Sequence, residues 1–125
     1  MTADGRPTAI GPYSPVLRSG EWIVCSGQLG LVDGAPAPGA GEQTRLALES
    51  VARLLASQGA DLGDVVKTTV FLSEMGDFAA MNAAYAAAFG EHRPARSAVG
   101  VAALPLGAQI EIEAWAHVPE GGATR

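Results

Sequence analysis

The chain is poor in cysteine. Its 125 residues contain one, Cys25, which lies in the apolar run 22–25. A single thiol cannot form a disulfide within the chain, which fits a reducing compartment, so we expect a cytoplasmic protein. The apolar neighbours favour a buried small side chain at Cys25 over a nucleophile.

Basic residues and long apolar runs are also scarce. The chain has 8 Lys and Arg against 13 Asp and Glu, a formal net charge of −5, and its basic residues are scattered. Nucleic acid is therefore disfavoured as a partner, because phosphate-backbone binding needs clustered positive charge. No apolar run approaches the ~20 residues that span a bilayer. Residues 1–6 lack the basic-then-apolar pattern of a secretion signal, so we expect neither membrane insertion nor export.

Motifs for metals, phosphates and acyl transfer are missing. His92 and His117 are far apart and accompany no Cys or paired acidic motif, so we expect no metal site. The chain has neither a glycine-rich phosphate loop nor a Gly-x-Ser-x-Gly turn. What remains is an arginine, one or two carboxylates, a tyrosine and backbone groups. That set suits water attack on an already electrophilic small acid.

Periodicity and turn residues predict the order ββαβαββ. Apolar residues between Ala47 and Leu55 recur at steps of three and four, which predicts a helix ended by Gly59 in a left-handed conformation. Asp77 is placed to cap a second helix. The expected strands cover residues 14–18, 21–29, 65–72, 97–103 and 109–118, and 30–41 is expected to be a loop. We expect one α+β domain over 1–125, with a core at 9–118, frayed ends and a mixed sheet carrying both helices on one face.

The last predicted strand has two different faces. Its alternate residues from Ile110 to Ala116 are all apolar and would pack under the helices. The other set comprises Glu111, Glu113, Trp115 and His117. Trp115 is poorly suited to open water, so we expect another subunit to cover this face and a site where subunits meet.

Arg96 is the most informative candidate residue. It begins an apolar stretch, and the next predicted strand contains two carboxylates that could pair with it, Glu111 and Glu113. A buried ion without a partner is costly, and a guanidinium matches a carboxylate with two parallel hydrogen bonds. The sequence leaves two interpretations open: a pocket that binds a small organic acid, or an internal Arg–Glu pair that ties two strands together.

Other candidates also have a structural interpretation. Tyr13, in a rigid Gly-Pro-Tyr-Ser turn, could line a ligand site or simply pack. Gly27 could admit a ligand to the backbone or mark a bulge. Asn82 lies on the apolar stripe of the second helix and needs a polar partner, either a loop or a ligand. Lys67 could line a cationic pocket, although a snorkelling surface lysine is the simpler interpretation.

Eight short motifs fall in one order along about residues 9–118. They are Gly-Pro-Tyr-Ser at 11–14, Cys-Ser-Gly-Gln at 25–28, Gln-Thr at 43–44, Val-Lys-Thr-Thr-Val-Phe-Leu at 66–72, Asp-Phe at 77–78 with Asn82 and Tyr85, Pro-Ala-Arg-Ser at 94–97, Leu-Pro at 104–105 and Ile-Glu-Ile-Glu-Ala at 110–114. Together they resemble the RidA/YjgF family of reactive enamine/imine deaminases.

The resemblance implies a chorismate-mutase-like α+β sandwich assembled as a homotrimer, with ligand clefts between subunits. It implies hydrolysis of 2-iminopropanoate or 2-iminobutanoate to the 2-oxo acid and ammonia, without a cofactor. Arg96 matches the arginine that binds the substrate carboxylate, and Glu111 matches the acid that activates water. The remaining cleft positions match Tyr13, Ser26, Gly27, Asn82 and the backbone of Ala98.

Two departures from the family pattern bear on specificity. Ala98 stands where many bacterial members carry a cysteine, and the segment 90–93 is shorter than in many relatives. Arg93 could therefore add a second positive charge at the rim of the cleft. Two other functions stay open: a non-catalytic small-carboxylate-binding regulator or chaperone-like protein, and an endoribonuclease, against which the acidic balance argues.

Overall fold

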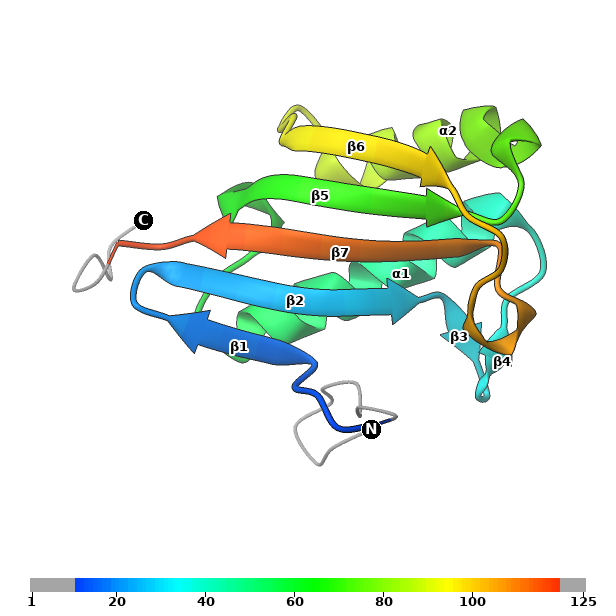
Figure 1. Ribbon diagram of the computed structural model, residues 1–125. Helices are drawn as coiled ribbons and strands as arrows, with labels where there is room; N and C mark the ends of the chain where they lie inside the picture. Colours follow the sequence, from blue (N-terminus) through cyan, green and yellow to red (C-terminus); the bar gives the residue numbers. More distant parts are fainter. Residues whose placement is uncertain (1–10, 120–125) are drawn as a thin grey trace.

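A mixed five-stranded sheet forms the body of the protein, as shown by a computed structural model that describes residues 11–119 (Figure 1). Its strands lie in the order β1-β2-β7-β5-β6. Only β5 and β6 run parallel, and the other neighbours are antiparallel. The strands are β1 Val16–Ser19, β2 Trp22–Leu29, β5 Val65–Leu72, β6 Ala95–Gly100 and β7 Ile110–His117. The α+β fold with both helices on one face of a mixed sheet is confirmed.

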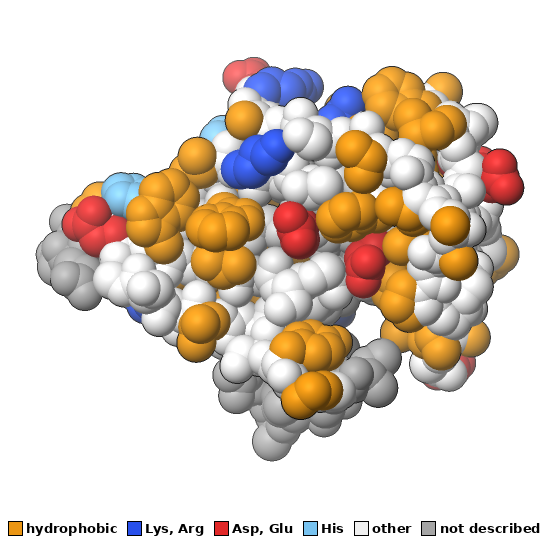
Figure 2. Space-filling model, in the orientation of Figure 1, with side chains coloured by type: hydrophobic (Ala, Val, Ile, Leu, Met, Phe, Trp, Pro, Cys, Tyr) orange, Lys and Arg blue, Asp and Glu red, His pale blue; other side chains and the backbone are white. Residues whose placement is uncertain are grey.

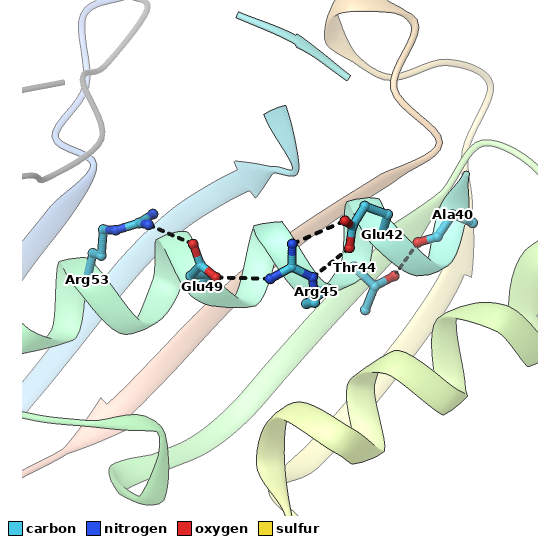
Figure 3. Close-up of polar contacts among 6 residues, drawn as sticks. All are labelled: Ala40, Glu42, Thr44, Arg45, Glu49 and Arg53. Atoms are coloured by element: carbon cyan, nitrogen blue, oxygen red, sulfur yellow. Dashed lines mark hydrogen bonds and ion pairs between the residues drawn. The ribbon is translucent and has the colours of Figure 1, made fainter. Parts of the chain in front are cut away.

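The first helix, α1 (Ala40–Ala56), buries the predicted apolar stripe against the sheet. Gly59 has φ +76°, and its N–H donates to the Ala56 carbonyl while that of Ala60 donates to Leu55. This is a Schellman ending, so the role predicted for Gly59 is confirmed. The outer face of α1 carries a ladder of ion pairs, Glu42–Arg45–Glu49–Arg53, at spacings of three and four residues (Figure 3). Such exposed pairs add little stability each.

The second helix, α2 (Phe78–Phe89), packs on the sheet through Met81, Tyr85 and Phe89. The Tyr85 hydroxyl shares a 2.7 Å hydrogen bond with that of Thr68 on β5, whose side chain is fully buried. The cap predicted from Asp77 is wrong, because its side chain makes no capping bond. Its carboxylate instead accepts a hydrogen bond from Gln109 at 3.1 Å, which joins the start of α2 to the start of β7.

Residues 30–41, predicted as a loop, contain a short hairpin of β3 (Leu31–Val32) and β4 (Ala35–Pro36) and, after residues 37–39, the start of α1. Asp33 and Gly34 form its turn with φ of +52° and +81°. Positive φ at both positions is the hairpin-turn pattern for which Asp-Gly is a strong signal. The sequence therefore held a hairpin signal that the loop prediction passed over.

Several strand boundaries also differ from the prediction, most of all in β1 and β6. β1 begins after Pro15, which has no N–H for a ladder, rather than at residue 14. β6 spans Ala95–Gly100 rather than 97–103, because its parallel pairing with β5 begins at Lys67 opposite Ala95. Arg96 therefore lies within a strand and not before it. The frayed ends predicted for 1–9 and 119–125 fall, apart from residue 119, outside the described residues.

The face of the sheet away from the helices is open within this chain. Ile110, Ile112 and the other inward residues of β7 are fully buried under the helices. Large apolar side chains remain exposed on the opposite side, among them Leu17, Trp22, Val99 and Trp115. Figure 2 shows these apolar patches around acidic side chains in the middle of this face. Neither helix in the described part of the chain combines the length and apolar character needed to cross a bilayer.

Candidate functional site

Arg96 lies on the helix side of the sheet, where α2 holds its guanidinium. Its Nη1 donates to Asn82 Oδ1 at 2.7 Å and also contacts Met81 Sδ at 3.8 Å. Its Cζ lies 4.9 Å from the centre of the Tyr85 ring and 5.6 Å from that of Phe78. Ring faces attract the cation and fix the plane of the guanidinium.

This arginine has an unused hydrogen-bonding edge. Within residues 11–119 its hydrogen bonds all leave from Nη1, and no carboxylate lies within ion-pair distance. Its Nε and Nη2 groups, a pair of parallel donors, therefore have no partner there. The internal pair with Glu111 or Glu113 that the sequence allowed is not formed. Asn82 gains the partner its position required, but that partner is Arg96 and not a loop.

A hollow of about 480 Å³ opens beside this group. Its lining consists of Asn82, Tyr85, Ala86, Arg93, Pro94 and Arg96. Burial raises the pKa of the Tyr85 hydroxyl, and its hydrogen bond to Thr68 and the charges of Arg96 and Arg93 oppose that rise. Two guanidinium groups thus act on one small hollow. An anion is the ligand that such a lining favours.

Glu111 lies on the opposite, open face of the sheet. Its carboxyl group is stacked on the backbone of Gly27, where the Cβ of any larger residue would come within 2.8 Å of Glu111 Cδ. The bulge that the sequence left open as one interpretation of Gly27 is present between Cys25 and Gln28 of β2. The lack of a side chain at Gly27 therefore leaves the space that the Glu111 carboxyl group occupies. Burial, followed by the charge of Glu113, raises the pKa of Glu111.

A second hollow of about 500 Å³ lies beside Glu111. Tyr13, Gly27 and Glu111 line one part of it, and Ser50 and Arg53 of α1 line another. Tyr13 is 47% exposed, so its ring forms a wall of this hollow rather than part of the core. A carboxylate of raised pKa beside a solvent-accessible hollow is suited to accept a proton from water.

The structure does not bring Arg96 and Glu111 together within one chain. Arg96 is paired through Thr68 to Ala114 on β7, and Glu111 lies three residues further along that strand. The two residues are thus about 10 Å apart along the strands and about 10 Å apart across them. They also point to opposite faces of the sheet. A single small molecule cannot contact both in one subunit.

The other predicted site residues have structural contacts. Ser26 donates its hydroxyl to the Ser14 carbonyl at 2.7 Å and so ties the N-terminal loop to β2. Ala98 packs partly against the core, on a strand at the edge of the sheet. Lys67 lies near the surface, where Nζ donates to Ser97 Oγ at 2.7 Å. Cys25 is buried as predicted, and burial raises its pKa to about 12, so the thiol stays protonated.

The two histidines are engaged in separate places. His92 Nε2 lies 2.7 Å from the Val65 carbonyl, and His117 Nε2 lies 3.1 Å from a Glu21 carboxylate oxygen. The part of the chain that the structure describes contains no group of three His, Cys, Asp or Glu residues able to hold a metal ion.

Sequence reasoning singled out Arg96, Asn82 and Glu111 as candidates but did not foresee that aromatic rings contact the guanidinium. Their place on the apolar stripe of α2 predicts only packing for Tyr85 and Phe78, whereas both also hold the guanidinium. The signal was their spacing on α2, since residues three or four apart from Asn82 share its side of the helix.

The fold and these two hollows define a small α+β protein with a guanidinium beside one hollow and a carboxylate of raised pKa beside the other. The family model for Endoribonuclease L-PSP matches residues 3–118. The chain therefore belongs to this family, which is the RidA/YjgF family that its motifs resemble.

Known relatives match over most of their length. The 2-iminobutanoate/2-iminopropanoate deaminase of Salmonella typhimurium is 43% identical over 121 residues, which cover 93% of this chain and 94% of that protein. The crystal structure of the YjgF gene product of Escherichia coli is 42% identical, with a TM-score of 0.86 and coverage of 92% and 94%. The structure of Escherichia coli TdcF with bound serine is 37% identical, with a TM-score of 0.87 and coverage of 93% and 95%.

Proposed function

We propose that the protein is a cofactor-independent hydrolase that converts small 2-imino acids such as 2-iminobutanoate and 2-iminopropanoate to 2-oxo acids and ammonia. The observation that carries the proposal is the unused Nε and Nη2 edge of Arg96, held beside a hollow by Asn82 and two rings. The name of the Salmonella typhimurium relative and the serine bound to TdcF support a small amino-acid-derived substrate.

Each step of this reaction has a residue suited to it. Arg96 binds the carboxylate with two hydrogen bonds and so orients the neighbouring imine carbon. With the imine nitrogen protonated, Glu111 takes a proton from water as the oxygen bonds to that carbon and the C=N electron pair moves to nitrogen, which gives a neutral carbinolamine. The proton then passes from Glu111 to nitrogen, the C–N bond breaks, and ammonia leaves as the C=O bond forms and the hydroxyl proton returns to Glu111. No electrons are gained or lost, so the reaction needs no redox cofactor.

The active site is completed by a second copy of the chain. Arg96 and Glu111 point to opposite faces of one sheet, so a substrate that contacts both lies between the Arg96 side of one subunit and the Glu111 side of its neighbour. The exposed apolar residues of the open face, with Trp115 at 44% exposure, are the surface that such a neighbour would cover. We propose the homotrimer expected from the family resemblance.

The test is an assay in which a dehydratase releases the imine and formation of the 2-oxo acid is followed. Wild type should accelerate the reaction over the uncatalysed rate. Arg96→Ala and Arg96→Lys should each lower kcat/KM by roughly 10- to 100-fold, because lysine lacks the two-pronged geometry. Glu111→Gln should lower kcat by about 100-fold or more.

Arg45→Gln is the matched control for Arg96, because it removes one guanidinium from the exposed ladder on α1. The kcat/KM of Arg45→Gln should equal that of wild type. Acceleration that survives both Arg96 variants would refute the proposed site. Binding of 2-oxo acids without any turnover, unaffected by Glu111→Gln, would instead favour a small-acid-binding regulator.

Cleavage of RNA is disfavoured by charge. The open face carries Glu111 and Glu113, and the whole chain has a formal net charge of −5. Phosphate backbones bind where several positive groups release counterions. We expect RNA to remain intact at moderate salt.

A further inference from the structure

Arg93 shares the hollow of Arg96 but has no function in the reaction just described. It lies in the loop between α2 and β6, and its guanidinium lines the same hollow of about 480 Å³. Its Nη1 donates to the carbonyl of Gly90, at the end of α2, and to that of His92. These bonds fix the head group at the rim of the hollow.

The backbone contacts explain the position of Arg93 but do not use up its donors. A guanidinium near a helix C-terminus is favourable, which accounts for the bond to Gly90. Within residues 11–119, however, the hydrogen bonds of Arg93 all leave from Nη1, and no carboxylate pairs with it. Its Nε and Nη2 groups remain available to a ligand, as do those of Arg96.

The charge of the hollow exceeds what one carboxylate neutralises. Its six lining residues include two guanidinium groups and no acid, in a chain of net charge −5. A monocarboxylic substrate would neutralise Arg96 and leave Arg93 unpaired beside it. A second carboxylate on the substrate would neutralise both, with charge-assisted hydrogen bonds at each end. The volume lies within the range of small-molecule sites and leaves room for a longer acid.

From this juxtaposition we propose that Arg93 determines specificity and that the preferred substrates are 2-imino dicarboxylic acids of four or five carbons. The inference rests on the proposed deaminase function. Arg96 binds the carboxylate next to the imine, and Arg93 binds the one at the far end of the side chain. The bonds made and broken at the imine carbon are those of the monocarboxylic reaction, because the second carboxylate only binds.

The experiment compares imines that differ in the distal carboxylate. The imines of aspartate, glutamate and 2-aminobutanoate are generated in situ by amino-acid oxidases. Hydrolysis is measured as the loss of imine available for trapping by semicarbazide. For wild type, kcat/KM should be higher for a dicarboxylic imine than for 2-iminobutanoate. Arg93→Gln should lower this ratio by roughly 10- to 100-fold, the loss expected for a charged hydrogen-bonding partner.

Arg93→Lys keeps the charge and should retain part of the ratio, and Arg45→Gln, which removes a guanidinium outside the hollow, should retain all of it. A thermal melt close to that of wild type establishes that each variant is folded. A wild-type ratio near or below one, or a ratio that Arg93→Gln does not change, would overturn the inference and leave the deaminase function standing.

A binding measurement separates failure of the inference from failure of the function. Calorimetric titration with 2-oxoglutarate, oxaloacetate and 2-oxobutanoate tests the hollow without turnover. If no imine is hydrolysed, the deaminase proposal fails, and tighter, Arg93-dependent binding of the dicarboxylic acids would still support the two-arginine site. Equal binding of all three acids, or binding indifferent to Arg93→Gln, would overturn it.

Discussion

Arg96 and Asn82 are separated by 14 residues in the sequence and joined by one hydrogen bond of 2.7 Å. Each could be singled out from the sequence, because a charged or amide group among apolar residues needs a partner. Their pairing could not, since it depends on the way α2 packs beside β6 after the chain crosses over. The sequence was equally compatible with an internal pair between Arg96 and a glutamate. Alternation along the last strand already puts Glu111 and Glu113 on the face away from the helices, but only the structure shows that Arg96 lies on the helix side.

Burial and, after it, the charge of Glu113 on the same face of β7 raise the pKa of Glu111, which gives a pH prediction. Glu113→Gln removes this repulsion, so the pKa of Glu111 falls and the carboxylate persists to lower pH. The acidic limb of kcat/KM against pH reports the base in the free enzyme and should move to lower pH. Glu42→Gln, an equal charge change on the outer face of α1, should leave the limb in place.

The raised pKa of Glu111 also makes the stability of the protein depend on pH. Because the pKa of Glu111 is higher in the folded protein, the folded state binds the carboxyl proton of Glu111 more tightly than the unfolded chain does. The contribution to stability is present at low pH and is lost as pH rises from the unfolded value through the folded value. Glu113→Gln should narrow the pH range over which this stability is lost.

An acidic limb of kcat/KM that stays in place or moves to higher pH in Glu113→Gln would contradict the assignment of Glu111 as the base.

At the scale of elements, the bond between Thr68 and Tyr85 joins β5 to α2 through two hydroxyl groups. Tyr85→Phe leaves the buried Thr68 hydroxyl without this partner and should cost about 1–3 kcal/mol in the free energy of unfolding. Adding Thr68→Val removes the unsatisfied group and should recover most of the loss. Chemical denaturation at one protein concentration measures both variants, since association also contributes. A double variant less stable than Tyr85→Phe would contradict this account.

Most elements follow from local signals, and each miss has an identifiable cause. The apolar stripe of α1 and the positive φ of Gly59 were predicted because a helix must bury one face and because its last carbonyl groups need hydrogen-bond donors. Asp77 misled because an Asp before a helix is a common cap, whereas here Gln109, distant in sequence, uses its carboxylate. The β3–β4 hairpin was missed although Asp33-Gly34 encodes its turn.

At the scale of the whole molecule, the sheet separates Arg96, on its helix side, from Glu111, on its open face. Order and type of the elements predicted an α+β sandwich, and the apolar outer face predicted a covering subunit. The division of Arg96 and Glu111 between faces could not be derived without strand register, because a shift of one residue exchanges the faces. In the proposed homotrimer, each subunit holds half of each of two sites, one on either side of its sheet.

This division makes a prediction that a site within one chain does not. Arg96→Ala and Glu111→Ala subunits should each be inactive alone, but mixed trimers should regain activity. A site is intact wherever the arginine comes from a Glu111→Ala subunit and the glutamate from an Arg96→Ala neighbour. With equal, random mixing this holds for about a quarter of the sites.

Coexpression supplies the mixed trimers, native mass spectrometry counts their subunits, and the imine assay measures the recovered rate. Mixing Arg96→Ala subunits with subunits that carry both substitutions is the control. No interface of that mixture contains an intact arginine, so the rate should stay at that of the single variants. Mixed trimers of the two single variants that prove equally inactive would mean that Arg96 and Glu111 do not serve one substrate across a subunit boundary.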